Sequence, residues 1–461
     1  AIEQVLAAVR RYAEREPGKK WVRGGGWPLT IKGGEPHKSM LDKIVPDRPV
    51  ILDAADGHSA WVNSRALEIA GITKETSDPP RGRIERDSAT GEPTGILREA
   101  AVRLVINETP HYTHGECVDG LRRGLKLANR FGITSVQEAQ VVEQHLKAFA
   151  ELDKSGELTV RAVTAMRFDP TKDLSQVSQF VEWRTKFAGK RLRATAVKIF
   201  EDGVIESRTA ALLTPYLGAG PAERGWLNVE PDVLNPLAAE LDRLGFQIHI
   251  HAIGDRAIQA SLDALQFARA RNGSRDSRHH IAHLELFDSS DIPRFRRLGV
   301  VANFQPLWAW ADPYIVDLTI PILGPERSRY LYPIRSVANT GAVIACGSDW
   351  SVSSMNPLDA IQIAMTRRGL AEGPGPAWIP EETVDLSQIL AGYTINGAYV
   401  NFEETETGSI EVGKAADLVV LDRNLFDVAP HEIHLAKVLL TLLEGKEVYR
   451  AEGFADGARS P

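Results

Sequence analysis

The sequence predicts an α/β protein built around a (β/α)8 TIM-type barrel, and three observations carry this prediction. Short apolar strands alternate with helical stretches, as in βαβ units that form a parallel sheet. The strand predicted at residues 247–252 alternates strictly, so that Ile248 and Ile250 share one face while His249 and His251 share the other. The length of 461 residues suits one barrel of about 250 residues or more with additions.

The region before the barrel is rich in loops and lacks this rhythm. Strands are predicted at residues 21–27 and 48–52, and a helix is predicted at residues 61–70. The density of Pro, Gly, Arg and Asp over residues 79–95 indicates a structured loop with a hairpin around residues 89–91. These elements predict a region that is added to the barrel and does not supply regular βα units.

Seven barrel strands are predicted, separated by helices such as residues 118–131, 233–244 and 257–270. The strands are expected at residues 133–137, 160–166, 195–200, 247–252, 279–284, 300–305 and 343–346. A closed barrel of this type has eight strands, so the remaining strand is expected upstream of residue 118. From residue 407, hairpin-forming strands with a turn at residues 444–446 predict a small all-β layer beside the barrel.

Composition and charge favour a small-molecule partner. The net charge of -7 is spread without a basic stripe, which argues against nucleic acid, and no apolar run approaches the roughly 20 residues of a membrane helix. Cys117 and Cys346 form no disulfide or thiolate motif, so a cytoplasmic location is expected. The chain opens on Ala1 inside an amphipathic helical pattern without a signal-peptide layout. An upstream segment, with any targeting signal, is therefore expected to be missing.

Polar side chains near the C-terminal ends of four predicted strands are candidates for catalysis and metal binding. They are Lys198, His251, His283 and Asp349. Parallel barrels place their active sites at this end, and imidazole with carboxylate suits zinc or another divalent transition metal. Structural alternatives stay open: Asp349 could cap the next helix, the histidines could be hydrogen-bonded core residues, and Lys198 could be an ion-pair partner.

Four further side chains are weaker candidates for substrate binding: His58, His249, Arg208 and Gln305. The alternative for His58 is a role in organising its loop, and the alternative for His249 is to fill the lumen behind His251. Residues 279, 281 and 283 are expected to share one face of their strand. His279 and His280 are predicted to be structural or surface residues.

Seven segments stand in an order that is specific, although each alone is a weak signal. They are Asp56-Gly57-His58 with Trp61 to Ser64, Gly91 to Gly95, Val197 to Gly203 with Arg208-Thr209-Ala210, His251 to Asp255, Arg278 to His283, Gly347-Ser348-Asp349, and Gly413 to Leu418. Together they resemble the amidohydrolase superfamily, specifically its amidohydrolase-3 branch of YtcJ-like proteins and N-substituted formamide deformylases. The resemblance covers nearly the whole chain.

This resemblance implies a barrel with a β-sandwich assembled from both chain ends, and a site for one or two divalent ions, with zinc the first expectation. Lys198 resembles the family's strand-four lysine, which is carboxylated in many relatives so that it bridges two metals. His251 resembles the strand-five ligand and His283 the strand-six ligand. Asp349 resembles the strand-eight acid, which serves as ligand and catalytic residue.

The family's His-x-His signature on strand one is absent from this sequence. Residues 1–117 therefore resemble the large insertion between barrel strand one and its helix. Residues 118–405 resemble barrel strands two to eight, and residues 406–461 resemble the C-terminal part of the β-sandwich. Strand one and two metal ligands are expected to be missing.

The implied function is hydrolysis of a C–N amide bond, with N-substituted formamides as one candidate class. A metal-activated water would attack, and Asp349 would take its proton and pass it to the leaving amine. Two alternatives stay open: an inactive fragment or degenerate homologue without a complete metal site, and an ester or lactone hydrolase on the same scaffold. The expected partner is a small molecule, with a homodimer as an open expectation.

Overall fold

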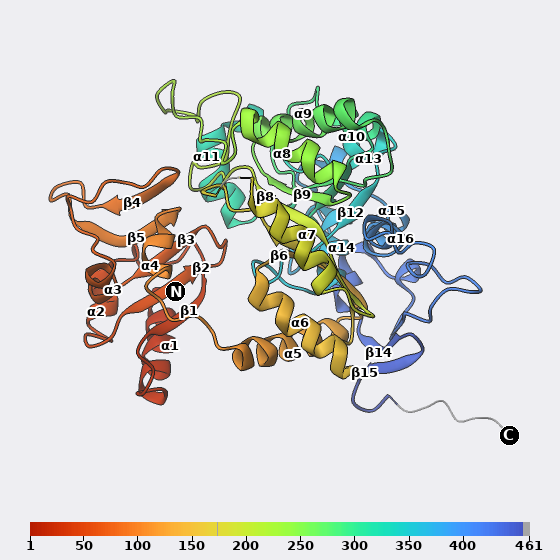
Figure 1. Ribbon diagram of the computed structural model, residues 1–461, viewed down its shortest axis with the longest axis horizontal. Helices are drawn as coiled ribbons and strands as arrows, with labels where there is room; N and C mark the ends of the chain where they lie inside the picture. Colours follow the sequence, from red (N-terminus) through yellow and green to blue (C-terminus); the bar gives the residue numbers. More distant parts are fainter. Residues whose placement is uncertain (173, 455–461) are drawn as a thin grey trace.

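The computed structural model describes residues 1–172 and 174–454, which form three sheets (Figure 1). The central sheet has seven parallel strands in the order β12-β11-β10-β9-β8-β7-β6. The strands are β6 (Ser135–Val141), β7 (Arg161–Arg167), β8 (Leu192–Phe200), β9 (Gln247–Ala252), β10 (His280–His283), β11 (Val301–Phe304) and β12 (Ile344–Cys346). The predicted α/β class and all seven predicted barrel strands are confirmed.

The central sheet is strongly curled. Gln137 on β6 donates a hydrogen bond to the side chain of Gln247 on β9 at 2.9 Å, although β7 and β8 lie between these strands. In a flat sheet the two strands would be about 14 Å apart, because neighbours are spaced about 4.8 Å. Curling alone brings these side chains together over the concave face, as in a barrel lumen.

The edge strands of this sheet are β6 and β12, and within the described residues they do not pair with each other. A gap therefore separates these two edges, as the expected absence of barrel strand one implies. Asp349, beyond the end of β12, is still close enough to act electrostatically on Glu138 of β6. The two edges thus face one another across the open side of the barrel.

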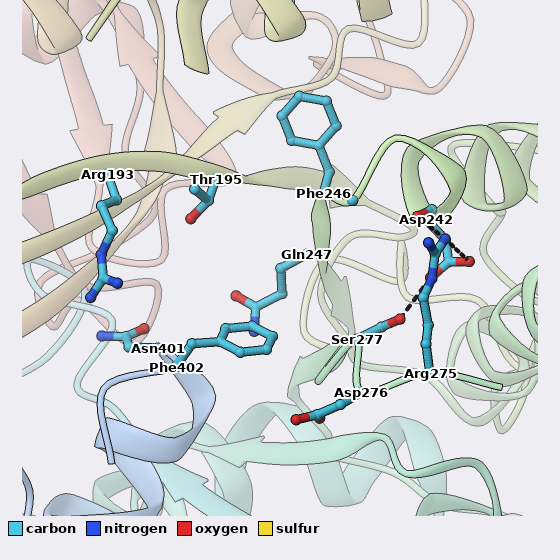
Figure 2. A pocket seen from close by; sticks show the side chains of 11 residues that line it. Arg193, Thr195, Asp242, Phe246, Gln247, Arg275, Asp276, Ser277, Asn401 and Phe402 are labelled. Atoms are coloured by element: carbon cyan, nitrogen blue, oxygen red, sulfur yellow. Dashed lines mark hydrogen bonds and ion pairs between the residues drawn. The ribbon is translucent and has the colours of Figure 1, made fainter. Parts of the chain in front are cut away.

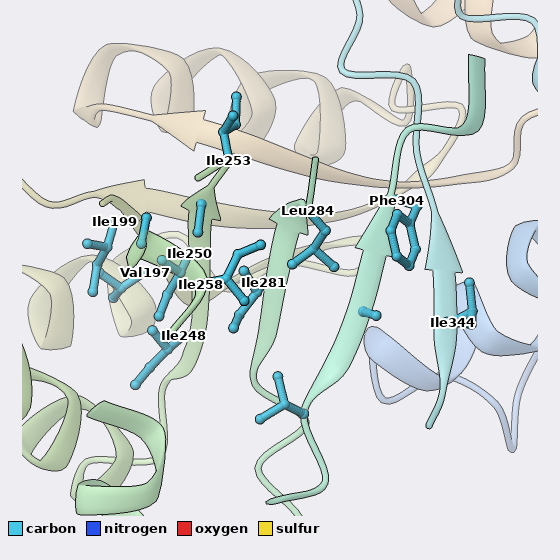
Figure 3. Packing of buried hydrophobic residues seen from close by; sticks show 14 of the residues in the cluster. Val197, Ile199, Ile248, Ile250, Ile253, Ile258, Ile281, Leu284, Phe304 and Ile344 are labelled. Carbon is cyan, nitrogen blue, oxygen red and sulfur yellow. The ribbon is translucent and has the colours of Figure 1, made fainter. Parts of the chain in front are cut away.

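Apolar side chains on the convex face of the sheet pack under the surrounding helices (Figure 3). Ile248 and Ile250 of β9 are fully buried there together with Val197 and Ile199 of β8. Burial of one such side chain stabilises the fold by about 2 kcal/mol. The predicted alternation on β9 therefore assigns its apolar side chains to the core and its polar ones to the lumen.

The predicted helices at residues 118–131, 233–244 and 257–270 are confirmed as α5, α8 and α9. The helices from the barrel region onward are α5 (His114–Arg130), α6 (Glu143–Ser155), α7 (Gln176–Lys186), α8 (Pro231–Arg243), α9 (Asp255–Asn272), α10 (Ile292–Leu298), α11 (Ile320–Leu323), α12 (Pro325–Ser328), α13 (Ile334–Asn339), α14 (Pro357–Thr366), α15 (Leu386–Tyr393) and α16 (Ile395–Val400). No helix in the described part of the chain is long and apolar enough to cross a membrane.

The N-terminal region forms its own sheet, in the order β1-β2-β3-β5-β4, and lies to one side of the barrel (Figure 1). Its elements are α1 (Ile2–Arg15), β1 (Val22–Trp27), α2 (Lys38–Asp42), β2 (Val50–Ala54), β3 (Ser59–Val62), α3 (Ser64–Ile69), β4 (Gly82–Arg86), β5 (Pro93–Glu99) and α4 (Val102–Ile106). The two predicted strands and the hairpin between β4 and β5 are confirmed.

The helix predicted at residues 61–70 is wrong in its first part. Trp61 and Val62 belong to β3, where they are fully buried between β2 and β5. The helix α3 begins only at Ser64, because the side chain of Asn63 caps it by accepting a hydrogen bond from the backbone N–H of Ala66 at 3.0 Å. Pairing within the sheet overrides the helical pattern of the sequence.

The C-terminal region forms a three-stranded antiparallel sheet of β13 (Leu418–Leu421), β14 (Val438–Leu443) and β15 (Lys446–Arg450), which confirms the predicted hairpin strands. Asp417 fastens this sheet to the barrel: it accepts hydrogen bonds from Arg161 at 2.8 Å and from the backbone N–H of Glu444 at 2.7 Å. Arg191 also donates to Glu444 at 2.7 Å. Residues 455–461 of the predicted C-terminal region lie outside the described residues.

We predict that Asp417→Asn destabilises the fold by about 3 kcal/mol, the lower end for breaking one side of a buried ion pair. Asp417 is 1% exposed and its partner Arg161 is 11% exposed, so the remaining arginine charge would be left poorly solvated. Urea unfolding measures the change. The control Asp422→Asn, whose carboxylate pairs with the adjacent Arg423 near the surface, should cost less than about 1 kcal/mol. Equal effects would contradict this role for Asp417.

The pKa of Glu444 predicts that the stability of the fold depends on pH. Its hydrogen bond from Arg191, with further help from Lys190, lowers the pKa of Glu444 to about 2 from an ordinary value of 4.5. The resulting stability is fully present above pH 4.5 and is lost as the pH falls through 2. We expect the stability difference between the wild type and Glu444→Gln to shrink over that window in unfolding experiments. A constant difference would show that the charge of Glu444 does not hold the sheet.

Candidate functional site

The polar face of β9 lines the concave side of the sheet, as predicted. Gln247, at the start of the strand, donates hydrogen bonds to the backbone carbonyls of Arg278 and Val400 at 2.8 and 2.6 Å. His249 and His251 follow toward the C-terminal end, and both are buried. The first polar residue of β9 is therefore held by hydrogen bonds at the base of the barrel, and the two polar residues that follow are imidazoles nearer the mouth.

His283 reaches the lumen by a route that differs from the prediction. The register pairs His280 with His249 and Ile281 with Ile250, so Ile281 faces the core, and the common face expected for residues 279, 281 and 283 is wrong. Positive φ angles of 79° at His283 and 55° at Leu284 end the alternation. This turn of the backbone brings the imidazole of His283 to 4.4 Å from that of His251, measured between ring centroids.

His280 is not a surface residue but lies in the lumen, where its ring centroid is 4.2 Å from that of His249. Among the described residues, neither nitrogen of His280 nor Nδ1 of His249 has a hydrogen-bond partner. Burial lowers the pKa of His280 to about 3 and that of His249 well below 6.5, so both rings are neutral. His279 is structural, as predicted, because it accepts a hydrogen bond from the backbone N–H of Ile248.

Lys198 occupies the same layer as His249, with which it is paired in register across β8 and β9. The lysine is 2% exposed. Burial lowers its pKa to about 8, against the opposing effect of Asp349. No hydrogen bond or ion pair engages its amine within the part of the chain that the structure describes, so the ion-pair alternative for Lys198 finds no partner.

Asp349 lies in the loop beyond β12, where its backbone adopts a φ of 51°. It is three residues further along the chain than the end of the strand. Its charge acts on both Lys198 and His283; it partly offsets the burial that lowers the pKa of His283 to about 4. Among the four side chains singled out by the sequence, His251 packs against His283, and Lys198 and Asp349 lie close enough to His283 to act on it electrostatically.

The N-terminal region contributes His58 to this mouth, with its ring 5.4 Å from that of His251. The Nδ1 atom of His58 is 3.0 Å from the carboxylate of Glu99, which also accepts a hydrogen bond from Thr209 at 2.7 Å. Burial disfavours the charged imidazole, but Glu99 outweighs this effect and raises the pKa of His58 to about 9. At neutral pH the mouth therefore contains an imidazolium.

Two carboxylates near the histidines were not among the candidate site residues predicted from the sequence. Glu99 ends β5 with no motif around it, and only its contact with His58 reveals a role. Asp202 follows β8 within a segment that was singled out, and it accepts hydrogen bonds from the backbone N–H groups of Ala211, Ile253 and Gly254 at 2.9 to 3.0 Å. Asp202 thereby fixes the loops on either side of His251.

Gln305 and Arg208 differ in their relation to the histidines. Gln305 is buried, and its Oε1 atom has no hydrogen-bond partner among the described residues. Trp308, three residues further on, stacks on His283 with an interplanar angle of 10°. The guanidinium of Arg208 instead pairs with Glu223 at 3.6 Å, and in the described structure no ion pair or hydrogen bond links it to the histidines.

A separate hollow of about 310 Å³ lies at the opposite end of the strands (Figure 2). Its lining includes Gln247 at the start of β9 and the side chains of Arg193 and Arg275. Both arginines are already paired, Arg193 with Glu403 and Arg275 with Asp242. Neither of these two arginines is therefore free to bind a ligand in the hollow.

The imidazole nitrogens and carboxylate oxygens at the mouth are donor atoms of the types that bind transition metals. Nε2 of His251 faces the carbonyl oxygen of Gly203 at 3.2 Å and must carry the hydrogen, which leaves Nδ1 as the free lone pair. Nδ1 of His283 is buried without a hydrogen-bond partner in the described structure. Even so, no three His, Cys, Asp or Glu side chains within residues 1–172 and 174–454 are already arranged as a metal-holding group.

Comparison with known proteins places this geometry in context. The model of the amidohydrolase family matches residues 1–449. The chain is 34% identical to the protein LONG AFTER FAR-RED 3 of Arabidopsis thaliana over 93% of this chain and 74% of that protein. It is 28% identical to the putative amidohydrolase YtcJ of Bacillus subtilis, covering 97% of this chain and 83% of that one. The N-substituted formamide deformylase of Arthrobacter pascens is also 28% identical, over 98% and 83%.

Solved structures share the architecture. An uncharacterized metal-dependent hydrolase from Pyrococcus horikoshii superposes with a TM-score of 0.70 at 23% identity, covering 93% of this chain and 81% of that one. At this level of identity the likeness shows the fold, which is the barrel-type fold predicted from the sequence.

Proposed function

Because the chain belongs to the amidohydrolase family, we propose that it is a metal-dependent hydrolase that cleaves a C–N amide bond, with N-substituted formamides as the first class to test. The observation that carries the proposal is the meeting of Lys198, His251, His283 and Asp349 at one mouth of the barrel. These residues come from β8, β9, β10 and the loop after β12, which are spread over the sequence. The deformylase among the relatives supports the choice of formamides.

We assign His251, His283, Lys198 and Asp349 as the residues that would hold one or two divalent ions, zinc first. A bound ion of this kind would lower the pKa of a water molecule and polarise the substrate carbonyl. The free Nδ1 atoms of the two histidines support the assignment. A pKa of about 8 leaves part of Lys198 as the neutral amine near pH 7, the form that adds to carbon dioxide to give a carbamate and a proton.

The remaining steps fall to the side chains of this protein. The carboxylate of Asp349 accepts the proton of the attacking water and returns it to the nitrogen of the leaving amine. The imidazolium of His58 is placed to donate a hydrogen bond to an oxygen atom of the substrate, and Trp308 holds the ring of His283 in place. His249 and His280 stay neutral beneath this layer, and Gln305 presents its free amide oxygen to the substrate.

The division into residues 1–117, 118–405 and 406–461 is kept as part of this proposal, with the first region as the insertion that supplies His58. A non-catalytic homologue is the rival, and it is favoured by the unpaired edges of β6 and β12 and by the lack of a preformed three-residue metal group among the described residues. Metal content separates the two. Matched amides and esters would then define the bond that is cleaved.

We predict that Asp349→Asn lowers the turnover of amides by at least about 10²-fold, the usual scale for loss of general acid–base help. The amide keeps the size of the side chain but cannot take up the proton. Steady-state hydrolysis of a formamide measures the effect, and circular dichroism checks the fold. The control Asp232→Asn, on the exposed first turn of α8, should keep normal turnover. Near-normal activity of Asp349→Asn would remove Asp349 from the mechanism.

We also predict different metal contents for two histidine variants of β9. His251→Ala should lose most bound metal together with activity, because it removes a free nitrogen at the mouth. His249→Ala should keep most of its metal, since the ring of His249 packs against that of His280, whereas the ring of His251 packs against that of His283. Mass analysis of the purified proteins gives both values. The reverse order of metal loss would show that His249, rather than His251, is the metal ligand on β9.

A further inference from the structure

The N-terminal region and the barrel have separate apolar cores. The buried clusters of the N-terminal region lie within residues 2–105 and that of the barrel lies beyond residue 117, so within the described residues no such cluster crosses the boundary. Hydrogen bonds do cross it: the backbone N–H of Leu29 donates to the hydroxyl of Tyr314 at 2.8 Å, and Arg81 donates to the carbonyl of Leu227 at 2.9 Å. Polar interfaces of this kind permit relative motion more readily than a shared apolar core. The placement of side chains at this boundary therefore depends on individual hydrogen bonds.

One of these hydrogen bonds reaches the candidate active site. Glu99, the last residue of β5, accepts it from Oγ1 of Thr209 at 2.7 Å, and the two carboxylate oxygens lie 3.1 and 3.0 Å from Nδ1 of His58. Thr209 is fully buried in the loop after β8, where its Oγ1 accepts a hydrogen bond from the backbone N–H of Val204 at 2.9 Å. We call His58, Glu99 and Thr209 the bridge, because they join the N-terminal region to the barrel.

The bridge is packed against a glycine. A Cβ atom placed on Gly203 would lie 2.1 Å from Oγ1 of Thr209 and 2.4 Å from Oε1 of Glu99, which is closer than such atoms can approach. A residue without a side chain therefore lets the hydroxyl and the carboxylate meet at this point. The carbonyl oxygen of Gly203 is 3.2 Å from Nε2 of His251. The bridge thus ends on the backbone of a residue that also contacts a proposed metal ligand.

The bridge leaves one ring nitrogen of His58 for the substrate. Nδ1 faces Glu99, and within the part of the chain that the structure describes no hydrogen bond engages Nε2. The ring lies 5.4 Å from that of His251, measured between centroids. A hydrogen bond at one nitrogen of an imidazole fixes both the ring and the direction of its other nitrogen. Glu99 therefore sets the direction in which Nε2 of His58 points.

We propose that Glu99 is a positioning residue, which holds the imidazole of His58 over the barrel mouth and ties it to the barrel through Thr209. The N-terminal region then completes the active site only while the bridge is formed. This inference rests on the proposed hydrolase function, in which His58 contacts the substrate, and it adds the residues that place His58 there.

A double-mutant cycle tests whether Glu99 acts through His58. We expect Glu99→Ala in the full chain to lower kcat/KM for a formamide by about tenfold or more, the scale of a hydrogen bond to a charged group. In the His58→Gln background the same change should cost less than about twofold, because the effects of residues in one network do not add. Glu14→Ala, on exposed α1 of the same region, should have no effect in either background. Equal losses from Glu99→Ala in both backgrounds would overturn the positioning role.

Two variants of Thr209 test the barrel end of the bridge. Thr209→Ser keeps the hydroxyl, whereas Thr209→Val keeps the shape of the side chain and cannot donate a hydrogen bond to Glu99. We expect Thr209→Val to lower kcat/KM as Glu99→Ala does, and Thr209→Ser to stay near the wild-type value. Mass analysis should find the same metal content in both. Equal kcat/KM in the two variants would overturn the role of the hydroxyl.

A spectroscopic measurement separates this inference from the proposed function. In protein labelled with ¹³C at the histidine Cε1 atoms, the NMR signal of His58 is identified by its absence from His58→Gln. This signal should shift in Glu99→Ala and in Thr209→Val, where the carboxylate is retained, but not in Thr209→Ser or Glu14→Ala. If no formamide is hydrolysed while the signal shifts in this way, only the proposed function fails. If formamides are hydrolysed and the signal stays unchanged in Thr209→Val, the bridge is overturned and the hydrolase proposal stands.

Discussion

The parallel register of β8, β9 and β10 is the constraint on which the site depends. It places Lys198, His249 and His280 in one row, and Phe200, His251 and Ala282 in the next row toward the mouth. Paired residues of neighbouring parallel strands point to the same face. A shift of one residue would send the imidazoles into the core and the isoleucines into the lumen. The burial of Ile248, Ile250 and Ile281 under the helices therefore also fixes the orientation of the polar side chains.

The electrostatic character of the lumen changes with depth. At the base, Gln137 and Gln247 join in a network of neutral hydrogen bonds. In the middle, His249 and His280 are buried so completely that they remain uncharged. At the mouth, the Glu99 carboxylate keeps His58 protonated at neutral pH. Lys198 is the exception in the middle row, because its pKa of about 8 leaves it mostly protonated at neutral pH beside these neutral imidazoles.

The sequence was most informative where a regular period operates. Alternation on β9 predicted correctly that His249 and His251 face away from Ile248 and Ile250, and the seven parallel strands followed from the spacing of apolar runs. The same reasoning misplaced Ile281 and His280, because a strand as short as β10 gives little periodicity and ends in left-handed backbone at His283. Trp61 was misplaced because pairing between β2, β3 and β5 connects segments that sequence windows treat separately.

Residues that act through long-range contacts gave no signal in the sequence. Glu99 is 41 residues from His58, and Asp202 is 51 residues from Ile253, whose backbone N–H donates a hydrogen bond to it. Only the curled sheet and the N-terminal region bring such residues together, so their roles depend on tertiary structure.

The sheet also holds the candidate site residues unequally. His249, His251 and His283 stand on β9 and β10, where a rigid sheet limits them to a narrow range of positions, whereas Asp349 lies in the loop beyond β12. Loops vary more readily than strands without disturbing the core. The position of Asp349 is therefore less constrained by the sheet than the positions of the histidines.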